Sequence, residues 1–180
     1  MEPPITKWTP EECTVTSTGN KIYKKSSLYG MQNIIIAGKS ILSKDCLLRG
    51  DLSTMRMGKF VFVGERAVVR AGHRGFSKGV TMLPVHVGDN VIIEEDVITA
   101  AAQIGSYSRI GKGAVIGRSV IIKECCRVEP GAVVPPDSVF PPFSIIAGNP
   151  ARVVGSMPDC TQDLAAQAAK ELYESYVIQR

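Results

Sequence analysis

The chain carries only two histidines, His73 and His86. Histidine is the side chain best suited to general acid–base catalysis near neutral pH, and it is a common zinc ligand. A zinc site needs a third nitrogen or sulfur ligand, and no cysteine stands in frame with either histidine. The sequence therefore predicts no metal and no cofactor, and it leaves His73 or His86 open as the general base of an acyltransferase.

An aliphatic residue followed by glycine recurs on a frame of six residues. The fold that this repeat indicates must position the two histidines. A helix repeats its apolar positions every three or four residues and a strand every two, so a period of six is typical of a β-helix. The sequence predicts an all-β fold, a left-handed parallel β-helix of hexapeptide repeats with a C-terminal α-helix packed on it. The pairs that carry the repeat are Met57-Gly58, Val63-Gly64, Val87-Gly88, Ile104-Gly105, Ile110-Gly111 and Ile116-Gly117.

The periodicity divides the chain into three parts. We expect an N-terminal arm over residues 1–20, the β-helix domain over residues 21–155 and the C-terminal helix over residues 156–180. Thr161 or Asp159 can cap that helix. An apolar stripe is predicted to lie on the coil stack, since its members recur every four residues: Leu164, Ala168, Leu172 and Tyr176.

The five cysteines are odd in number and show no Cys-x-x-Cys spacing, which favours reduced thiols in the cytosol. Inward positions of the repeat are its first and fifth residues, because side chains alternate between the two faces of a strand. This alternation predicts that Cys46 and Cys126 are small interior fillers and that Cys125 points outward beside a corner.

The repeat is interrupted by a glycine-rich segment from Arg70 to about Leu83, which we expect to be a flexible surface loop. Partner surfaces of repeat proteins usually emerge at such interruptions. The segment combines cationic side chains with one aromatic, so it is the predicted partner-binding surface: His73, Arg74, Phe76 and Lys78. A solvated loop without a partner is the alternative interpretation.

Arg49-Gly50-Asp51 and the eleven-residue spacing from Ile93 to Ile104 resemble the core of the γ-class carbonic anhydrases. That resemblance implies that Arg49 and Asp51 pair across subunits. It also places the family's three zinc histidines on positions where this chain has no histidine: Arg70, Glu95 and Ala100. The resemblance thus implies that the chain keeps the coil spacing of a zinc enzyme but has lost the zinc ligands, so these three are degenerate site positions. We expect Arg70 and Glu95 to form an ion pair there.

Charge and hydropathy exclude two classes of partner. The net charge is +4 and the cationic residues are scattered, which argues against a nucleic-acid surface. No stretch of about 18 apolar residues is present, so we expect no direct membrane insertion. The first residues lack the apolar core of a signal peptide, which favours the cytoplasm.

Further segments together resemble the dynactin subunit 5 family, from about residue 17 to the terminal helix. The most specific are Glu94-Glu95-Asp96, which replaces the histidine-bearing coil, and the helix start at Pro158-Asp-Cys-Thr-Gln. The others include Gln32–Lys39, Phe76–Val80, Ala101–Tyr107, Lys123–Cys126 and the two proline pairs after Val134 and Phe140.

This resemblance implies a non-enzymatic scaffold of the cytoskeleton. The family's partners are a sister β-helical dynactin subunit, the actin-related protein at the pointed end of the filament, and the cargo adaptors of dynein. The implied role is support of microtubule-based transport and recruitment of adaptors and endosomes.

A hexapeptide-repeat enzyme, either an acyltransferase or a carbonic-anhydrase-like protein, is the alternative function. The segment Ile146-Ala-Gly-Asn-Pro-Ala-Arg is a common ending of such coils in both enzyme classes. It marks the exit from the last coil, so it indicates the fold more strongly than the activity.

Overall fold

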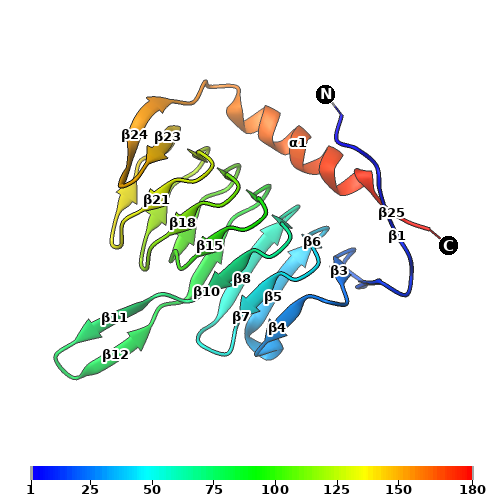
Figure 1. Cartoon of the computed structure of the whole chain (residues 1–180), viewed down its shortest axis with the longest axis horizontal. Coiled ribbons are helices and arrows are strands. Elements are labelled where there is room, and N and C mark those ends of the chain that lie inside the picture. The colour runs from blue at the N-terminus through cyan, green and yellow to red at the C-terminus, as the bar shows by residue number, and fades with distance from the viewer. Residues whose placement is uncertain (1, 180) are drawn as a thin grey trace.

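The computed structural model describes residues 2–179, which form a parallel β-helix with one helix along its side (Figure 1). Three parallel sheets make the faces of a triangular coil of six turns. The first face contains β4 (Ser27–Tyr29), β7 (Leu47–Arg49), β10 (Val68–Arg70), β15 (Ile98–Thr99), β18 (Val115–Ile116) and β21 (Val133–Val134). The second face contains β5 (Ile34–Gly38), β8 (Met55–Lys59), β13 (Val85–Val87), β16 (Gln103–Ile104), β19 (Ile121–Ile122) and β22 (Val139–Phe140).

The third face is the longest, and it begins and ends with an antiparallel pair. A 3₁₀ turn, η1 (Met31–Asn33), links the first two faces in the first coil. The expected left-handed β-helix of hexapeptide repeats is confirmed. The strands of the third face are β2 (Cys13–Val15), β3 (Lys21–Tyr23), β6 (Ile41–Leu42), β9 (Phe62–Val63), β14 (Ile92–Ile93), β17 (Arg109–Ile110), β20 (Arg127–Val128), β23 (Ser144–Gly148) and β24 (Ala151–Ser156).

The interior consists of columns of small and branched side chains, one from each coil. Strands of successive coils pair in register, so like positions stack directly on one another. On the first face, this stacking buries Leu48, Val69, Thr99, Ile116 and Val134 almost completely. The core is therefore a set of ladders of Val, Ile, Leu and Ala rather than a cluster of large aromatic rings.

The glycine of the repeat is required where one coil touches the next at a corner. A Cβ atom built on Gly105 would lie 2.4 Å from the carbonyl carbon of Lys123 and 2.5 Å from the amide nitrogen of Glu124. Backbone atoms of the next coil occupy that space, so no side chain fits. This contact explains the aliphatic-glycine pair that defines the sequence repeat.

The predicted burial of the cysteines is correct for two of three. Cys46 and Cys126 lie inside the coil, and burial raises the pKa of Cys46 to about 12. Cys125 was expected to point outward, but it is only 3% exposed. It occupies a corner whose equivalents in the coils on either side are Tyr107 and Phe143, and all three residues have a positive φ.

The C-terminal segment forms the helix α1 (Thr161–Ser175) and then β25 (Tyr176–Ile178). β25 pairs with β1 (Thr6–Trp8), which belongs to the expected arm. The predicted side-chain cap is wrong: Cys160 is the N-cap residue, and the Thr161 hydroxyl donates to the carbonyl of Pro158. Leu164 of the predicted stripe is exposed, whereas Ala169 is buried.

Lys21 fastens the end of α1 to the first coil. Its Nζ donates to the carbonyl oxygens of Tyr173, at 2.9 Å, and Tyr176, at 2.7 Å, and lies 3.8 Å from the Tyr173 ring centroid. The last carbonyls of a helix lack partners within the helix, so the half-buried ammonium group of Lys21 satisfies two carbonyls at this end.

We therefore expect Lys21→Met to lower the free energy of unfolding by about 2 kcal/mol, because charged hydrogen bonds contribute on that scale. Lys25→Met is the matched control, since Lys25 is exposed. Urea denaturation of both variants measures the difference. An equal loss in the two variants would show that Lys21 does not fasten the helix.

Candidate functional site

The predicted partner segment is an ordered β-hairpin rather than a flexible loop. Strand β11 (His73–Phe76) pairs antiparallel with β12 (Gly79–Met82), and Ser77 and Lys78 make the turn. At the base of the hairpin, the amide of Leu83 donates to the carbonyl of Gly72 at 2.8 Å. Figure 1 shows this hairpin projecting from the coil on the opposite side from α1.

The hairpin divides the predicted residues between its two faces. Arg74 and Phe76 lie on one face, and His73 lies on the other, because side chains alternate along a strand. Lys78 lies at the tip. The four residues therefore do not form one patch.

Sequence reasoning missed the second apolar component of the hairpin. Val80 and Met82 share the face of His73, and Val80 is 69% exposed, compared with 57% for Phe76. The alternation of Val80 and Met82 around Thr81 was the available signal, but the glycines that surround it favour a loop. Both faces of the hairpin thus expose apolar side chains next to cations, which is typical of a protein contact.

An isolated two-stranded hairpin is marginally stable in water, because it has no layer to pack against. Every residue from His73 to Met82 is exposed. Within residues 2–179, one side-chain hydrogen bond joins the hairpin to the coil, between Nε2 of His73 and a guanidinium nitrogen of Arg118 at 3.4 Å. Such a projection gains stability when a partner covers it.

The fold separates Glu95 from the other two former zinc positions. Arg70 ends β10, and Ala100 follows β15 at the same edge of the first face. Glu95 lies at the corner before β15, at the opposite edge of that face. Across residues 2–179, no group of three or more His, Cys, Asp or Glu side chains is arranged to hold a metal ion.

The predicted Arg70–Glu95 ion pair is wrong for the same reason. Glu95 instead pairs with Lys112 at 2.7 Å and with Arg66 at 3.5 Å. Arg66 also donates from Nε to Asp96 at 2.7 Å. Charges along this corner therefore neutralise each other between successive coils.

Arg49 and Asp51 form a fork within one chain. Nε and a terminal nitrogen of Arg49 donate to the two carboxylate oxygens of Asp51, each at 2.8 Å. Gly50 between them is buried, and a Cβ there would lie 2.5 Å from Ile34. The side chains that the carbonic anhydrase resemblance pairs across subunits are thus already partnered in this chain.

The remaining catalytic alternative has no assembled site around its histidines. His86 is exposed on the second face, in register with Arg56 and Gln103. His73 is on the hairpin beside Arg118. Neither histidine has a carboxylate hydrogen-bond partner among residues 2–179 that would orient it as a general base.

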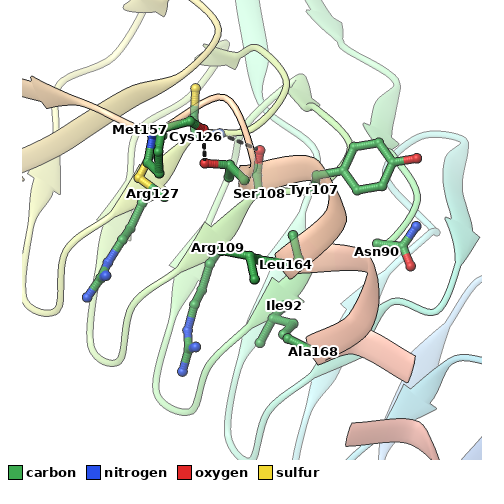
Figure 2. A pocket seen from close by; sticks show the side chains of 13 residues that line it. Asn90, Ile92, Tyr107, Ser108, Arg109, Cys126, Arg127, Met157, Leu164 and Ala168 are labelled. Carbon is green, nitrogen blue, oxygen red and sulfur yellow. Dashed lines mark hydrogen bonds between the residues drawn. The ribbon is translucent and has the colours of Figure 1, made fainter. Parts of the chain in front are cut away.

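A groove of about 220 Å³ lies between α1 and the third face. Figure 2 shows Ile92 facing Leu164 and Ala168 of the helix, and the guanidinium groups of Arg109 and Arg127 directed away from it. Arg109 pairs with Glu94, and Arg127 pairs with Glu129. The lining contains no His, Asp or Glu, so the groove has no carboxylate or imidazole base.

The corner charges make stability depend on pH. Hydrogen bonds from Arg66 lower the pKa of Asp96, so the pair stabilises the fold above the unfolded pKa of Asp, about 4. That contribution is lost as the pH falls through the lowered pKa. We expect Arg66→Met to lower the melting temperature at pH 7, and the difference from the native chain to shrink below about pH 4. A pH-independent difference would contradict this.

Comparison with known proteins identifies relatives along almost the whole chain. The family profile of dynactin subunit 5 matches residues 6–179. A dynactin subunit 5 from Dictyostelium discoideum is 47% identical over 162 residues, which cover 90% of this chain and 82% of that protein.

Solved structures with a similar fold are hexapeptide-repeat transferases. AntD, an N-acyltransferase from Bacillus cereus, superposes with a TM-score of 0.67 at 15% identity, over 84% of this chain and 88% of that one. The acetyltransferase domain of PglB from Neisseria gonorrhoeae gives 0.60 at 20% identity, over 76% and 58%. At these identities the likeness concerns the fold alone. Within residues 2–179, α1 is too short and too polar to span a membrane.

Proposed function

Because this chain belongs to the dynactin subunit 5 family, we propose that it is a non-catalytic structural subunit of the dynactin pointed-end complex. In this role it supports dynein-driven transport on microtubules and the recruitment of cargo adaptors and endosomes. Its partners are a sister β-helical subunit and the actin-related protein of the pointed end, and it works in the cytoplasm on the cytoskeleton. The family match over residues 6–179 is the observation that carries this proposal.

The geometry supports a scaffold in two ways. A stacked coil presents rigid, flat faces, and its ladder of in-register strands resists local deformation. Of the degenerate zinc positions, Glu95 lies at the opposite edge of the face from Arg70 and Ala100, and it is engaged by Lys112 and Arg66. Ala100 is buried, and Arg70 and Glu95 are surface residues at separate edges, so we infer a structural role for these positions.

We assign the hairpin β11–β12 as one partner contact of this subunit. It exposes Phe76, Val80 and Met82 beside Arg74 and Lys78, and within residues 2–179 neither of its faces is packed on the coil. A partner that buries these apolar side chains and pairs with the cations would stabilise the hairpin.

We expect replacement of both Arg74 and Phe76 by Ala to reduce recovery of the chain in the assembled complex at least tenfold, because aromatic and arginine side chains dominate such contacts. Quantitative purification through a tagged dynactin subunit measures this. Ser77→Ala in the turn is the matched control. Assembly and adaptor binding at native levels in the double variant would refute the hairpin contact, provided its melting temperature is unchanged.

An acyltransferase is the second function to test, because the structural neighbours named above are acyltransferases. Such an enzyme would transfer the acyl group of an acyl-coenzyme A thioester to an amine, with His73 or His86 taking a proton from the amine and the coenzyme A thiol leaving. Incubation of the purified chain with acetyl-coenzyme A and an amino sugar tests it. The scaffold proposal predicts no transfer above the rate of a chain with both histidines replaced by Ala.

A further inference from the structure

The outward side of the first face carries an unbroken column of aliphatic side chains. Strand pairing places one residue from each of five successive coils in direct register. Ile98 is 43% exposed and Val115 is 39% exposed, and the other three are half-buried. We call this set the aliphatic column: Leu47, Val68, Ile98, Val115 and Val133.

Parallel sheets are normally covered on both faces, so an aliphatic outer column that is left exposed to solvent is unusual. The second face shows the contrast, because its outward row includes Arg56, His86 and Gln103. These three polar side chains are consecutive in the row, and they separate Ile35 at one end from Ile121 and Val139 at the other. The first face therefore has the pattern of a sheet that is covered.

The third face of this chain shows how such a column is covered. Its outward positions Ile41 and Ile92 are almost fully buried, and α1 lies over this face, with Ala169 and Leu172 beside Ile41 and Ala168 beside Ile92. The dimensions agree, since strands repeat about every 4.8 Å and a helical turn rises about 5.4 Å. A helix laid across the strands can place one apolar side chain on each coil.

Cations without an ion-pair partner among residues 2–179 border the aliphatic column on one side. Arg70 and Arg118 lie at the edge where the first face ends, and the hairpin with Arg74 and Lys78 rises from the same edge. None of these four cations has an ion-pair partner within residues 2–179. At the opposite edge, Arg66 and Lys112 are already paired with carboxylates of this chain.

We propose that the aliphatic column is the docking surface for an amphipathic helix of a partner chain. Its apolar stripe lies on the column, and its carboxylates face Arg70 and Arg118. Five residues span about 19 Å at the strand spacing, so the helix needs at least about 13 residues. This occupant matches both the unpaired cations and the way α1 covers the third face. This surface is separate from the hairpin contact. The proposal rests on the proposed function only because the docked helix must come from another chain of an assembly.

Photo-crosslinking in the full chain tests the identity of the occupant. Benzoylphenylalanine replaces Ile98, and the control places it at Val139, which is 62% exposed on the second face. The chain is expressed in its own cells, irradiated and purified, and the joined peptides are sequenced by mass spectrometry. We expect Ile98 to capture one segment with apolar residues every three or four positions and Asp or Glu along one side.

Three outcomes overturn the proposal: capture of a strand segment, capture of a second copy of this chain, or capture no stronger than from Val139. The same purification shows separately whether dynactin subunits accompany the chain, so failure of the proposed function is distinguished from failure of this surface.

Two double variants test the chemistry of the surface. Ile98→Lys with Val115→Lys places two charges in the aliphatic column. Arg70→Glu with Arg118→Glu reverses the charge at the edge of the column. Each should reduce the captured segment's recovery at least tenfold with an unchanged melting temperature, and Val139→Lys should leave it at the native level. Native recovery in either double variant would overturn the proposal. If a double variant unfolds, the corresponding single substitutions are measured instead and must each reduce recovery.

Discussion

Gly105→Ala should destabilise the chain by about 3 kcal/mol, because overpacking of a rigid interior costs on this scale. The added methyl group would lie 2.4 Å from the carbonyl carbon of Lys123 and 2.5 Å from the amide nitrogen of Glu124. Both are backbone atoms of the next coil. Lys123 is held there by hydrogen bonds from its amide to the carbonyl of Phe140 and from the Ser108 hydroxyl to its own carbonyl, each at 3.3 Å, so the backbone of that coil must shift. Natural domains are stable by only about 5–15 kcal/mol, which makes this a large fraction of the total.

Gly75→Ala is the matched control for that substitution. Gly75 lies in the hairpin, and a Cβ atom there meets no atom within 4 Å. We expect a change within about 0.5 kcal/mol. Equilibrium urea denaturation of both variants measures the difference, and similar losses in the two would show that the corner contact does not require glycine.

Ile110→Ala should cost about 2–5 kcal/mol, the range measured for removing a large aliphatic side chain from a packed core. Ile110 is fully buried and stacks in register between Ile93 and Val128 of the adjacent coils. Truncation leaves a cavity that the coils cannot close, because each is fixed by hydrogen bonds to two neighbours.

Ile98→Ala is the control for Ile110, since it removes the same atoms from the outward aliphatic column. The Ile98 side chain is 43% exposed in the folded chain, so we expect its removal to lower the free energy of unfolding by about 1 kcal/mol or less. Comparable losses at the two positions would contradict the assignment of inward and outward columns. The pair of variants thus tests the packing of the coil and the exposure of its first face together.

The fold was predictable because one physical constraint repeats along the chain. Each coil brings its corner against the next, and only glycine fits at positions such as Gly105 and Gly111. The sequence therefore records the geometry of the coil at regular intervals. The buried positions of Cys46 and Cys126 followed from the same frame.

Features that depend on contacts between different coils were less predictable. Cys125 is buried at a corner between two coils, and the repeat contains no signal for its burial. Glu95 meets Lys112 and Arg66 because these three residues lie at one corner of successive coils, whereas Arg70 is at the far end of its strand. Local spacing cannot separate these edges without the register of the sheets.

The hairpin shows a different limit. Its glycines and the turn at Ser77 and Lys78 predict a loop, yet Val80 and Met82 alternate with Thr81 as in a strand. Strand pairing with His73 and Arg74 decides between the two, and that pairing joins residues 7 to 9 positions apart. The predicted partner residues consequently lie on two faces, and the apolar residues of β12 complete the surface.

We propose that the chain is a rigid subunit whose surfaces, rather than its histidines, carry its function. Purification of the tagged full-length chain from its own cells, followed by native mass spectrometry, tests this claim most directly. We predict recovery in one large assembly together with other dynactin subunits. Recovery as a homotrimer free of dynactin subunits, with acyl transfer from coenzyme A, would contradict it.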